Sequence, residues 1–393
     1  MPPITHDARR IATRLATITA MGTAMGITAV GCEAPRDTSQ GALEAPATIE
    51  AREEDAGTDA GVIEVVGDDE ATPSEAAPDA RHGAFFDELD APRLEVLRHA
   101  AITRIERGAG GRSVGFRLTF EDGSRGYFKP DQRFSGASDR AEVASYHVDR
   151  MLELGRVPTT TMREIPWSRL EPLLRGDARA SEVIVQPDGT VRGSLSSWVE
   201  DPLVPLELGV GFEAWFRVEP APYLTPFQRA RVFIAQAAGT EPIVPPVGEE
   251  GRALPLAGEP DRDDRGAELS DLVLFDHLVH NIDRWGGGFT NVRTRGRGGP
   301  LVFLDQGGAF GPGMQRIGFM DRRLAAVQRF RRSTVDAIRA LDLEALRERL
   351  VDEGFGELLD ERRLAGLEDR RRAILAHVDQ RLALQGESAT FPW

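Results

Sequence analysis

The sequence is short of cysteine, lysine and tyrosine, with one, one and three residues of these types. A disulfide needs two cysteines, so the single Cys32 excludes an internal bridge. No tract of basic residues is present, and nothing therefore indicates a nucleic-acid partner. The most apolar run, LATITAMGTAMGITAVG, is too short and weak for a comfortable transmembrane helix. At 393 residues, the chain could form two domains or one large two-lobed domain.

Acidic residues are concentrated near the N-terminus. The net charge of −15 includes −12 from 14 acids and two arginines between Glu33 and Ala80. This stretch has no aromatic residue and cannot bury enough apolar surface to offset its ordering entropy. We therefore expect residues 32–84 to be a disordered acidic linker, with a tether favoured over an acidic binding tail.

Residues 1–31 have the features of a targeting segment. Arginines at positions 9, 10 and 14 precede the apolar run, which ends in Ala29-Val30-Gly31-Cys32. This ending resembles the lipobox of bacterial lipoproteins, where the cysteine is lipidated after cleavage. The resemblance implies a lipoprotein signal peptide, lipidation of Cys32 and a protein anchored in the cell envelope outside the cytoplasm. An ordinary cleaved signal peptide is the alternative.

Strands dominate the first half of the remaining chain, and helices dominate the second. The sequence predicts a helix in FDELDAPRLEVLRHA and a hairpin formed by AITRIERG and SVGFRLTF. It predicts a third strand in RGYFKP. Asp139 opens a helix that Gly155 closes, and the strands SEVIVQ and GSLSSWVE flank a Pro-Asp-Gly turn. The pattern predicts an α+β, two-lobed fold: a small β-rich N-lobe over 85–200 and a larger helical C-lobe over 201–393.

Two aspartates stand on loops about twenty residues apart. Asp283 follows the amphipathic run LSDLVLFDHLVHN, and Asp305 follows the short apolar strand LVFL. Phosphoryl transfer needs one carboxylate to orient the incoming hydroxyl and another to hold the divalent metal on the nucleotide phosphates. A solvated Asp-Arg turn beside a Gly-rich hairpin would give the same pattern without any function.

Lys129 is the one lysine among 48 basic residues. An ammonium can enter a tight phosphate site as a point charge, whereas arginine is a planar fork. Lys129 ends the third predicted strand, just ahead of a helix that carries Glu142, and kinases use such a pair to hold nucleotide phosphates. A capping box with Asp139 is the alternative role for Glu142.

Four separated blocks, YFKPDQ, AEVASYHVDRMLELGRVP, HNIDRW and LDQGGAFG, resemble the secretory-pathway (Golgi) casein kinase family of atypical kinases. More distantly they resemble the phosphoinositide-kinase-like fold. The resemblance implies a protein-kinase-like fold, ATP with Mg²⁺ or Mn²⁺, and a protein or glycan substrate. It implies that Lys129 binds phosphate, Glu142 pairs with it, Asp283 is catalytic and Asp305 holds the metal.

Other positions follow less directly from that family. Gln306 stands where the family has asparagine after the metal aspartate, and Trp285 and Gly286 replace a common histidine pair. Asn291 is a candidate second metal ligand, although it lies eight residues after Asp283 instead of five.

The backbone N–H groups of Gly108, Gly110 and Gly111 could cover the phosphates, or these glycines could simply form a hairpin turn. SSWVE, which contains Trp198, would be the hinge beside the adenine.

Two other functions are compatible with the sequence. Asp276, His277, His280 and Asp283 fall at helical spacing and could ligate zinc in a metal hydrolase. A kinase-like fold could also bind a nucleotide or a partner protein without turnover. The sequence favours a membrane-tethered atypical kinase that transfers the γ-phosphoryl group of ATP to a hydroxyl, more plausibly on protein serine or threonine than on a glycan.

Overall fold

The structure is a computed structural model that describes residues 63–64, 83–108, 111–134, 138–206, 208, 212–218, 263–285, 289, 291–311 and 317–393. Contacts divide the chain into Met1–Ala56 and Gly57–Trp393, and every described residue lies in the second unit. The predicted signal peptide, Cys32 and Gly110 lie outside the described residues. No helix in the described ranges is both long and apolar enough to cross a membrane.

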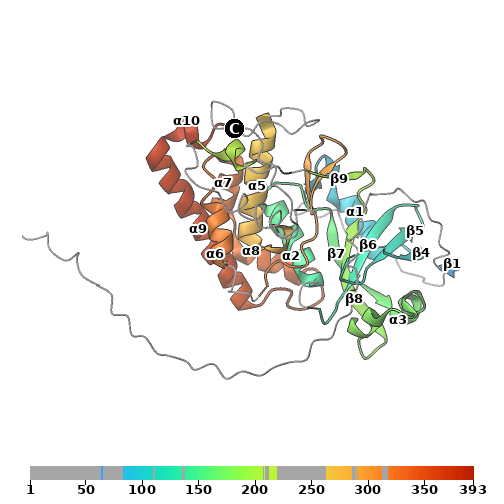
Figure 1. Cartoon of the computed structure of the whole chain (residues 1–393). Helices are drawn as coiled ribbons and strands as arrows, with labels where there is room; N and C mark the ends of the chain where they lie inside the picture. Colours follow the sequence, from blue (N-terminus) through green and yellow to red (C-terminus); the bar gives the residue numbers. More distant parts are fainter. Residues whose placement is uncertain are drawn as a thin grey trace, which may run out of the picture. The chain divides into compact units, whose positions relative to one another are not determined.

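A six-stranded antiparallel sheet forms the β-rich part (Figure 1). Its spatial order is β1 (Ile63–Glu64), β4 (Ile102–Arg107), β5 (Phe116–Phe120), β6 (Arg125–Pro130), β8 (Thr190–Ser197) and β7 (Thr160–Pro166). Buried and less buried residues alternate along β5 and β6, as expected for strands with one apolar face. The strand β1 lies inside the segment expected to be a linker, and it forms one edge of the sheet by pairing with β4.

Two strand assignments need correction. The sequence indicated no strand at β7, yet β7 pairs with β8 over seven consecutive residues. SEVIVQ, which was predicted to be a strand, is the end of the 3-10 helix η2 (Ala178–Glu182) followed by isolated bridges at Val183 and Val185. Because β7 occupies the free edge of β8, the SEVIVQ segment has no long edge with which to pair.

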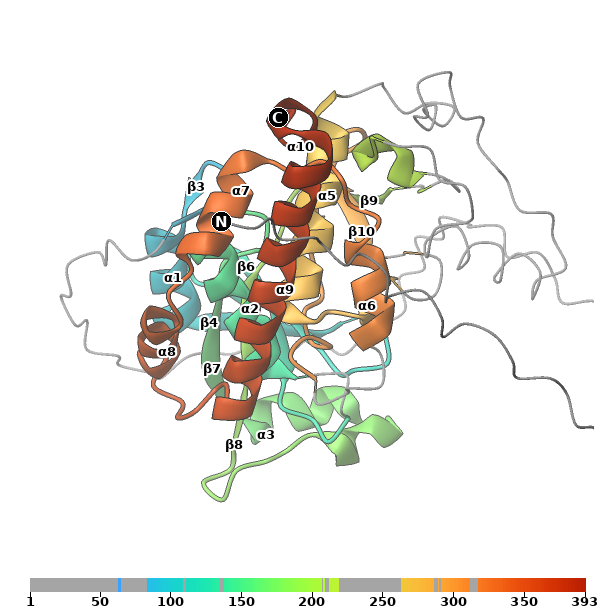
Figure 2. The ribbon, with the colours of Figure 1, turned by 90° about the vertical axis from the view of Figure 1, so that its left-hand side faces the viewer.

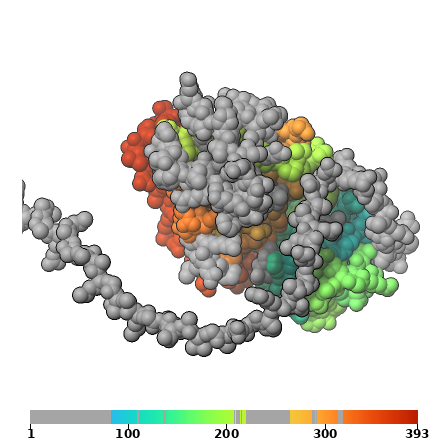
Figure 3. All heavy atoms as spheres, viewed as in Figure 1, coloured from blue at the N-terminus to red at the C-terminus, as the bar shows by residue number. Residues whose placement is uncertain are grey.

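The two faces of this sheet have different partners. Phe116, Leu118, Phe128 and Leu195 form an apolar core on one face. Three helical segments contribute to that core: α1 (Asp90–His99), α3 (Trp167–Leu170) and η1 (Glu171–Leu174). The residues from α3 to β8, coloured green, form outer surface beside β4–β6 (Figure 3). The opposite face carries Lys129 and packs against α2.

Helix α2 (Asp139–Met151) lies between the sheet and the helical part. Its N-cap is Ser138, whose hydroxyl accepts a hydrogen bond from Ala141 N at 3.2 Å. Nearly every residue of α2 is buried, and its apolar residues join the core of the helical part rather than that of the sheet. A helix buried on all sides transmits a fixed orientation to the side chains that it carries.

The helical part surrounds α5 (Asp263–Val279), which is buried along almost its whole length. Figures 1 and 2 show α9 running along α5, with α6 and η3 also packed against it. The remaining helices are η3 (Phe212–Phe216), η4 (Asp283–Trp285), α6 (Ile317–Leu324), α7 (Arg332–Ala340), α8 (Leu343–Val351), α9 (Glu361–Gln385) and α10 (Glu387–Thr390).

Two small sheets complete the described fold. The first contains β11 (Leu301–Phe303), β10 (Val292–Arg295) and β9 (Leu203–Pro205), in that spatial order. The second is a hairpin of β2 (Ala84–Phe85) and β3 (Glu88–Leu89). The β10–β11 hairpin separates Asp283 from Asp305, as the sequence predicted, and it presents Asp305 two residues after β11.

Candidate active site

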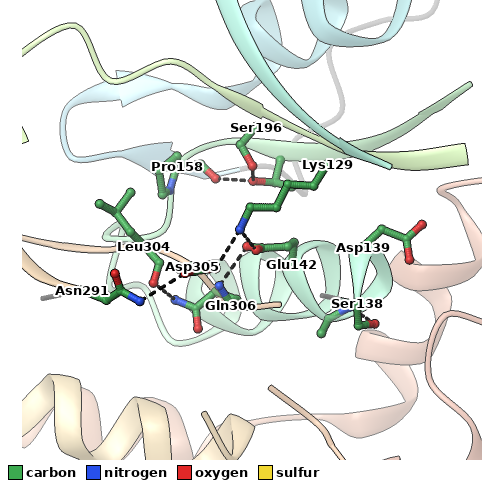
Figure 4. Close-up of polar contacts among 12 residues, drawn as sticks. Lys129, Ser138, Asp139, Glu142, Pro158, Ser196, Asn291, Leu304, Asp305 and Gln306 are labelled. Carbon is green, nitrogen blue, oxygen red and sulfur yellow. Dashed lines mark hydrogen bonds and ion pairs between the residues drawn. The ribbon is translucent and has the colours of Figure 1, made fainter. Parts of the chain in front are cut away.

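Lys129 forms the centre of a charged cluster between the sheet and the loop after β11. Its Nζ donates to Glu142 Oε1 at 2.5 Å and to Asp305 Oδ1 at 2.7 Å (Figure 4). The Lys129 side chain is 20% exposed and that of Glu142 is 8% exposed, so water screens this pair weakly. The cluster joins residues 176 positions apart in the sequence.

Local structure explains why these side chains meet. Lys129 is on the face of β6 that is turned toward α2, and Glu142 is in the first turn of α2. The alternative of a capping box is not formed, because Ser138 is the N-cap and the Glu142 carboxylate is used elsewhere. Its Oε2 accepts a hydrogen bond from Gln306 N at 3.0 Å, so Glu142 links the strand, the helix and the loop.

Asp305 has a left-handed backbone, with φ of 57°, which is uncommon for a residue other than glycine. Buried amides hold this conformation. Asn281 Nδ2 donates to Asp305 O at 3.0 Å and to Gln306 Oε1 at 2.8 Å. Gln306 in turn donates to Phe303 O at 3.0 Å. Strained residues concentrate at functional sites because the surrounding contacts must fix them.

Asn291 lies beside Asp305 in spite of its unusual spacing. Its Nδ2 donates to Asp305 Oδ2 at 3.1 Å, so each carboxylate oxygen has a different partner. The β10–β11 hairpin brings the two residues together, since Val292 pairs with Phe303.

Asp283 is exposed and adjoins the same loop at Gly308. A Cβ built on Gly308 would lie only 3.2 Å from Asp283 Cβ, closer than side chains normally pack. The absence of a side chain at Gly308 therefore allows the loops of Asp283 and Asp305 to touch.

Arg284 was not singled out from the sequence, yet it connects both aspartate loops. The side chain is fully buried, and its Nε donates to both carboxylate oxygens of Asp276, at 3.0 and 2.8 Å. Its Nη1 donates to Leu304 O at 2.5 Å, directly before Asp305. Burial raises the pKa of Asp276 to about 6, although Arg284 acts in the opposite direction. A contact between residues eight apart, across a helix end, leaves no periodic signal in the sequence.

Asp276 is not available as a zinc ligand, because both of its carboxylate oxygens already accept hydrogen bonds from Arg284. Burial lowers the pKa of His277 to about 4. Within the part of the chain that the structure describes, no group of three or more His, Cys, Asp or Glu side chains could hold a metal ion.

The other predicted ATP-binding residues have contacts outside the Lys129 cluster, and the backbone N of Gly108 donates to Gly115 O at 2.8 Å. Gly111 is exposed with φ of 77°, and its carbonyl accepts from Arg179 at 2.9 Å. Trp198 follows β8, and its backbone N donates to Arg125 O at 3.0 Å. The Trp198 ring lies 6.3 Å from that of Tyr127, centroid to centroid.

Electrostatics makes the cluster suitable for a cation and phosphates together. Burial alone would lower the pKa of Lys129, but attraction to Glu142 and Asp305 outweighs burial and raises it. Attraction to Lys129 lowers the pKa of Asp305 in turn. One ammonium and two carboxylates leave a formal charge of −1, so polyphosphate would bind only with an additional cation. Carboxylate and amide oxygens are the ligands that Mg²⁺ and Mn²⁺ prefer, and Asp305 with Asn291 fits this requirement.

Known structures share this fold. The Golgi casein kinase matches with a TM-score of 0.50 at 17% identity, over 76% of this chain and 78% of that one. The Golgi casein kinase with Mn and ADP bound matches with a TM-score of 0.53 at 17% identity, over 77% and 78%. The hydra Fam20 structure with sugar matches with a TM-score of 0.51 at 17% identity, over 76% of this chain and 90% of that one.

Sequence comparison points in the same direction. Four-jointed box protein 1 of Homo sapiens is 27% identical over 261 residues, which is 61% of this chain and 50% of that protein. The Mus musculus protein is 28% identical over 272 residues, which is 61% of this chain and 49% of that protein. The chain thus spans about half the length of the curated relatives it matches. No family model matches the chain.

Together these comparisons confirm the resemblance to the Golgi casein kinase-like atypical kinases and an α+β kinase-like fold.

Proposed function

We propose that this chain is a kinase that transfers the γ-phosphoryl group of ATP to a hydroxyl group. One observation carries the proposal: the single lysine contacts Glu142 on a buried helix and Asp305 on a strained loop. The similarity in fold to a structure described as having Mn and ADP bound supports this use of the cluster.

Each residue would have a distinct task. Lys129 would contact the nucleotide phosphates, while Glu142 keeps the ammonium in place. Asp305 and Asn291 would hold a divalent metal, which would neutralise charge on the transferring group. Asp283, which is exposed and adjoins Gly308, would orient the incoming hydroxyl and accept its proton. Catalysis would depend on positioning and charge neutralisation rather than on a covalent intermediate.

The roles of the two aspartates can be separated with isosteric variants of the full chain. Asp305→Asn should lose metal-dependent ADP binding, measured by equilibrium titration with Mn²⁺. Asp283→Asn should bind ADP as the wild type does, but should lose transfer of label from γ-labelled ATP. Asp336→Asn on α7, with an exposed side chain, is the matched control. Equal loss of binding in both site variants would contradict these roles.

For the acceptor, we propose serine or threonine of a protein, with a glycan as the alternative. The similar proteins include one named as a casein kinase and one whose structure contains sugar, so both acceptors belong in the same assay. Labelled casein without labelled glycan would support the first acceptor, and the reverse would overturn it. Nucleotide binding without any transfer would instead favour a kinase-like module without turnover.

We also propose that the protein is a lipoprotein anchored through Cys32, with residues 1–31 as its signal peptide, 32–84 as a tether, and lobes at 85–200 and 201–393. The basis is the single cysteine at the end of an apolar run. Cys32→Ser should leave an unprocessed or soluble protein that no longer partitions into detergent. Unchanged detergent partitioning of Cys32→Ser would contradict lipid anchoring through Cys32.

A further inference from the structure

Lys129 is not alone on its face of the sheet. Side chains two residues apart along a strand share a face, so Tyr127 lies on the Lys129 side. Strand pairing extends this into a cross-strand row. The row consists of Glu106, Arg117, Tyr127, Ser196 and Thr160. Figure 4 shows Ser196 near Lys129, on the side of the sheet where Lys129 meets the loop of Asp305.

The ring of Tyr127 is fixed against the base of the β4–β5 hairpin. A Cβ on Gly115 would lie 2.3 Å from the Tyr127 hydroxyl, and one on Gly108 would lie 2.7 Å from it. These two glycines pair through their backbones, with Gly108 N donating to Gly115 O at 2.8 Å. They therefore make room for the phenol ring of Tyr127. Burial raises the pKa of Tyr127, so the ring is neutral at physiological pH.

Other flat groups adjoin this ring. The Trp198 ring is tilted 48° to that of Tyr127, at 6.3 Å between centroids. The Arg117 guanidinium carbon lies 5.7 Å from the centre of the Trp198 ring, and Arg117 is also bonded to Glu106 at 3.1 Å. Arg117 keeps 37% of its side chain exposed, because α2 packs mainly on β7 and β8. Aromatic rings and guanidinium planes are groups on which a nucleobase stacks.

We propose that Tyr127, with Trp198 and Arg117 beside it, is the surface on which the base of a purine nucleotide stacks while Lys129 contacts the phosphates. This inference rests on the proposed function, since it assigns the base-recognition residues of the same site. Stacking uses the π face of the base, and a purine offers a larger face than a pyrimidine. Tyr127 is thus a specificity-determining residue for purine over pyrimidine nucleotides.

The test measures binding and needs no turnover. ADP, UDP and inorganic tripolyphosphate are titrated with Mn²⁺ into the full chain, into Tyr127→Leu and into the matched control Tyr127→Phe. Tyr127→Leu should weaken ADP binding on the order of ten- to a hundredfold, the range for loss of one base–aromatic stack. It should reduce the preference for ADP over UDP and leave tripolyphosphate binding unchanged. Tyr127→Phe should behave as the wild type does.

Several results would overturn the inference. The inference would be wrong if Tyr127→Leu bound ADP with an affinity within twofold of that of the wild type. Equal losses for ADP and tripolyphosphate would also overturn it, because Tyr127 would then only support the phosphate site. If Tyr127→Leu does not fold, Trp198→Leu gives the second test, with the same selective loss for ADP expected and an unselective one contradicting it. A wild type that binds neither ADP nor tripolyphosphate would refute the proposed function itself, whereas wild-type ADP binding that Tyr127→Leu retains refutes only this inference.

Discussion

Replacing Glu353 by glutamine should destabilise the protein and change how its stability depends on pH. Glu353 follows α8 but reaches into the β-rich part, where its carboxylate is 1% exposed. It accepts hydrogen bonds from His147 Nε2 at 2.9 Å, Thr161 Oγ1 at 2.7 Å, Met162 N at 3.1 Å and Arg98 Nη2 at 3.0 Å. Glu353 thereby ties α2, which carries Glu142, to the helical part.

The size of the effect follows from the carboxyl group. Burial alone would raise the pKa of Glu353, but its bond and attraction to His147, with Arg98 and Thr161, lower it from 4.5 to about 2. A carboxyl group whose pKa is lower in the folded than in the unfolded protein stabilises the fold. This stability is fully present above the pKa of the unfolded protein and is lost as the pH falls through the pKa of the folded protein. A difference of about 2.5 units corresponds to roughly 3 kcal/mol in the free energy of unfolding.

The assay is urea unfolding of the wild type and Glu353→Gln from pH 7 to pH 3. The wild type should be more stable by roughly 3 kcal/mol at pH 7, and roughly half of this gap should have disappeared by about pH 3.3. Glu357→Gln, an exposed glutamate in the same connection, should stay within about 0.5 kcal/mol of the wild type. A gap for Glu353→Gln that does not change with pH would refute the reasoning.

Two further substitutions test the contact between the aspartate loops. Gly308→Ala should reduce phosphoryl transfer by on the order of 10²-fold with little change in melting temperature, because its Cβ would displace Asp283. Gly311→Ala, whose Cβ has an ordinary 3.7 Å contact, is the control, and normal transfer in Gly308→Ala would argue against the loop contact. Arg284→Gln should lower the free energy of unfolding by about 3–5 kcal/mol, because the buried Asp276 carboxylate would lose the arginine that pairs with both of its oxygens. Urea unfolding that shows a loss below about 1 kcal/mol would contradict this role.

Local sequence was sufficient to predict much of the cluster around Lys129. The hairpin pattern before RGYFKP predicted the strand that carries Lys129, and the helix start at Asp139 located Glu142 near it. Each of these features is a pattern of residues close together in the chain, so it can be recognised from a single sequence. The apolar strand before Asp305 was recognisable for the same reason.

Contacts between distant residues could not be read in this way. His147 and Glu353 are 206 positions apart, and neither lies in a pattern that indicates the other. The β7 strand does not alternate regularly, since its first three residues are all buried. Tyr127 stood inside a recognised strand, but only the pairing of β4, β5, β6 and β8 shows which side chains adjoin it.

Lys129→Arg tests the central claim most directly, because the protein uses arginine at its 47 other basic positions. A surface lysine could be replaced with a change of no more than about 0.5 kcal/mol in stability and no effect on function. At this site, the larger guanidinium would displace Glu142, Asp305 or the nucleotide phosphates. The measurement compares melting temperature and transfer of label from γ-labelled ATP in the wild type and the variant. We expect a folded variant whose transfer rate falls by about 10²–10³-fold, and normal transfer by Lys129→Arg would contradict the kinase proposal.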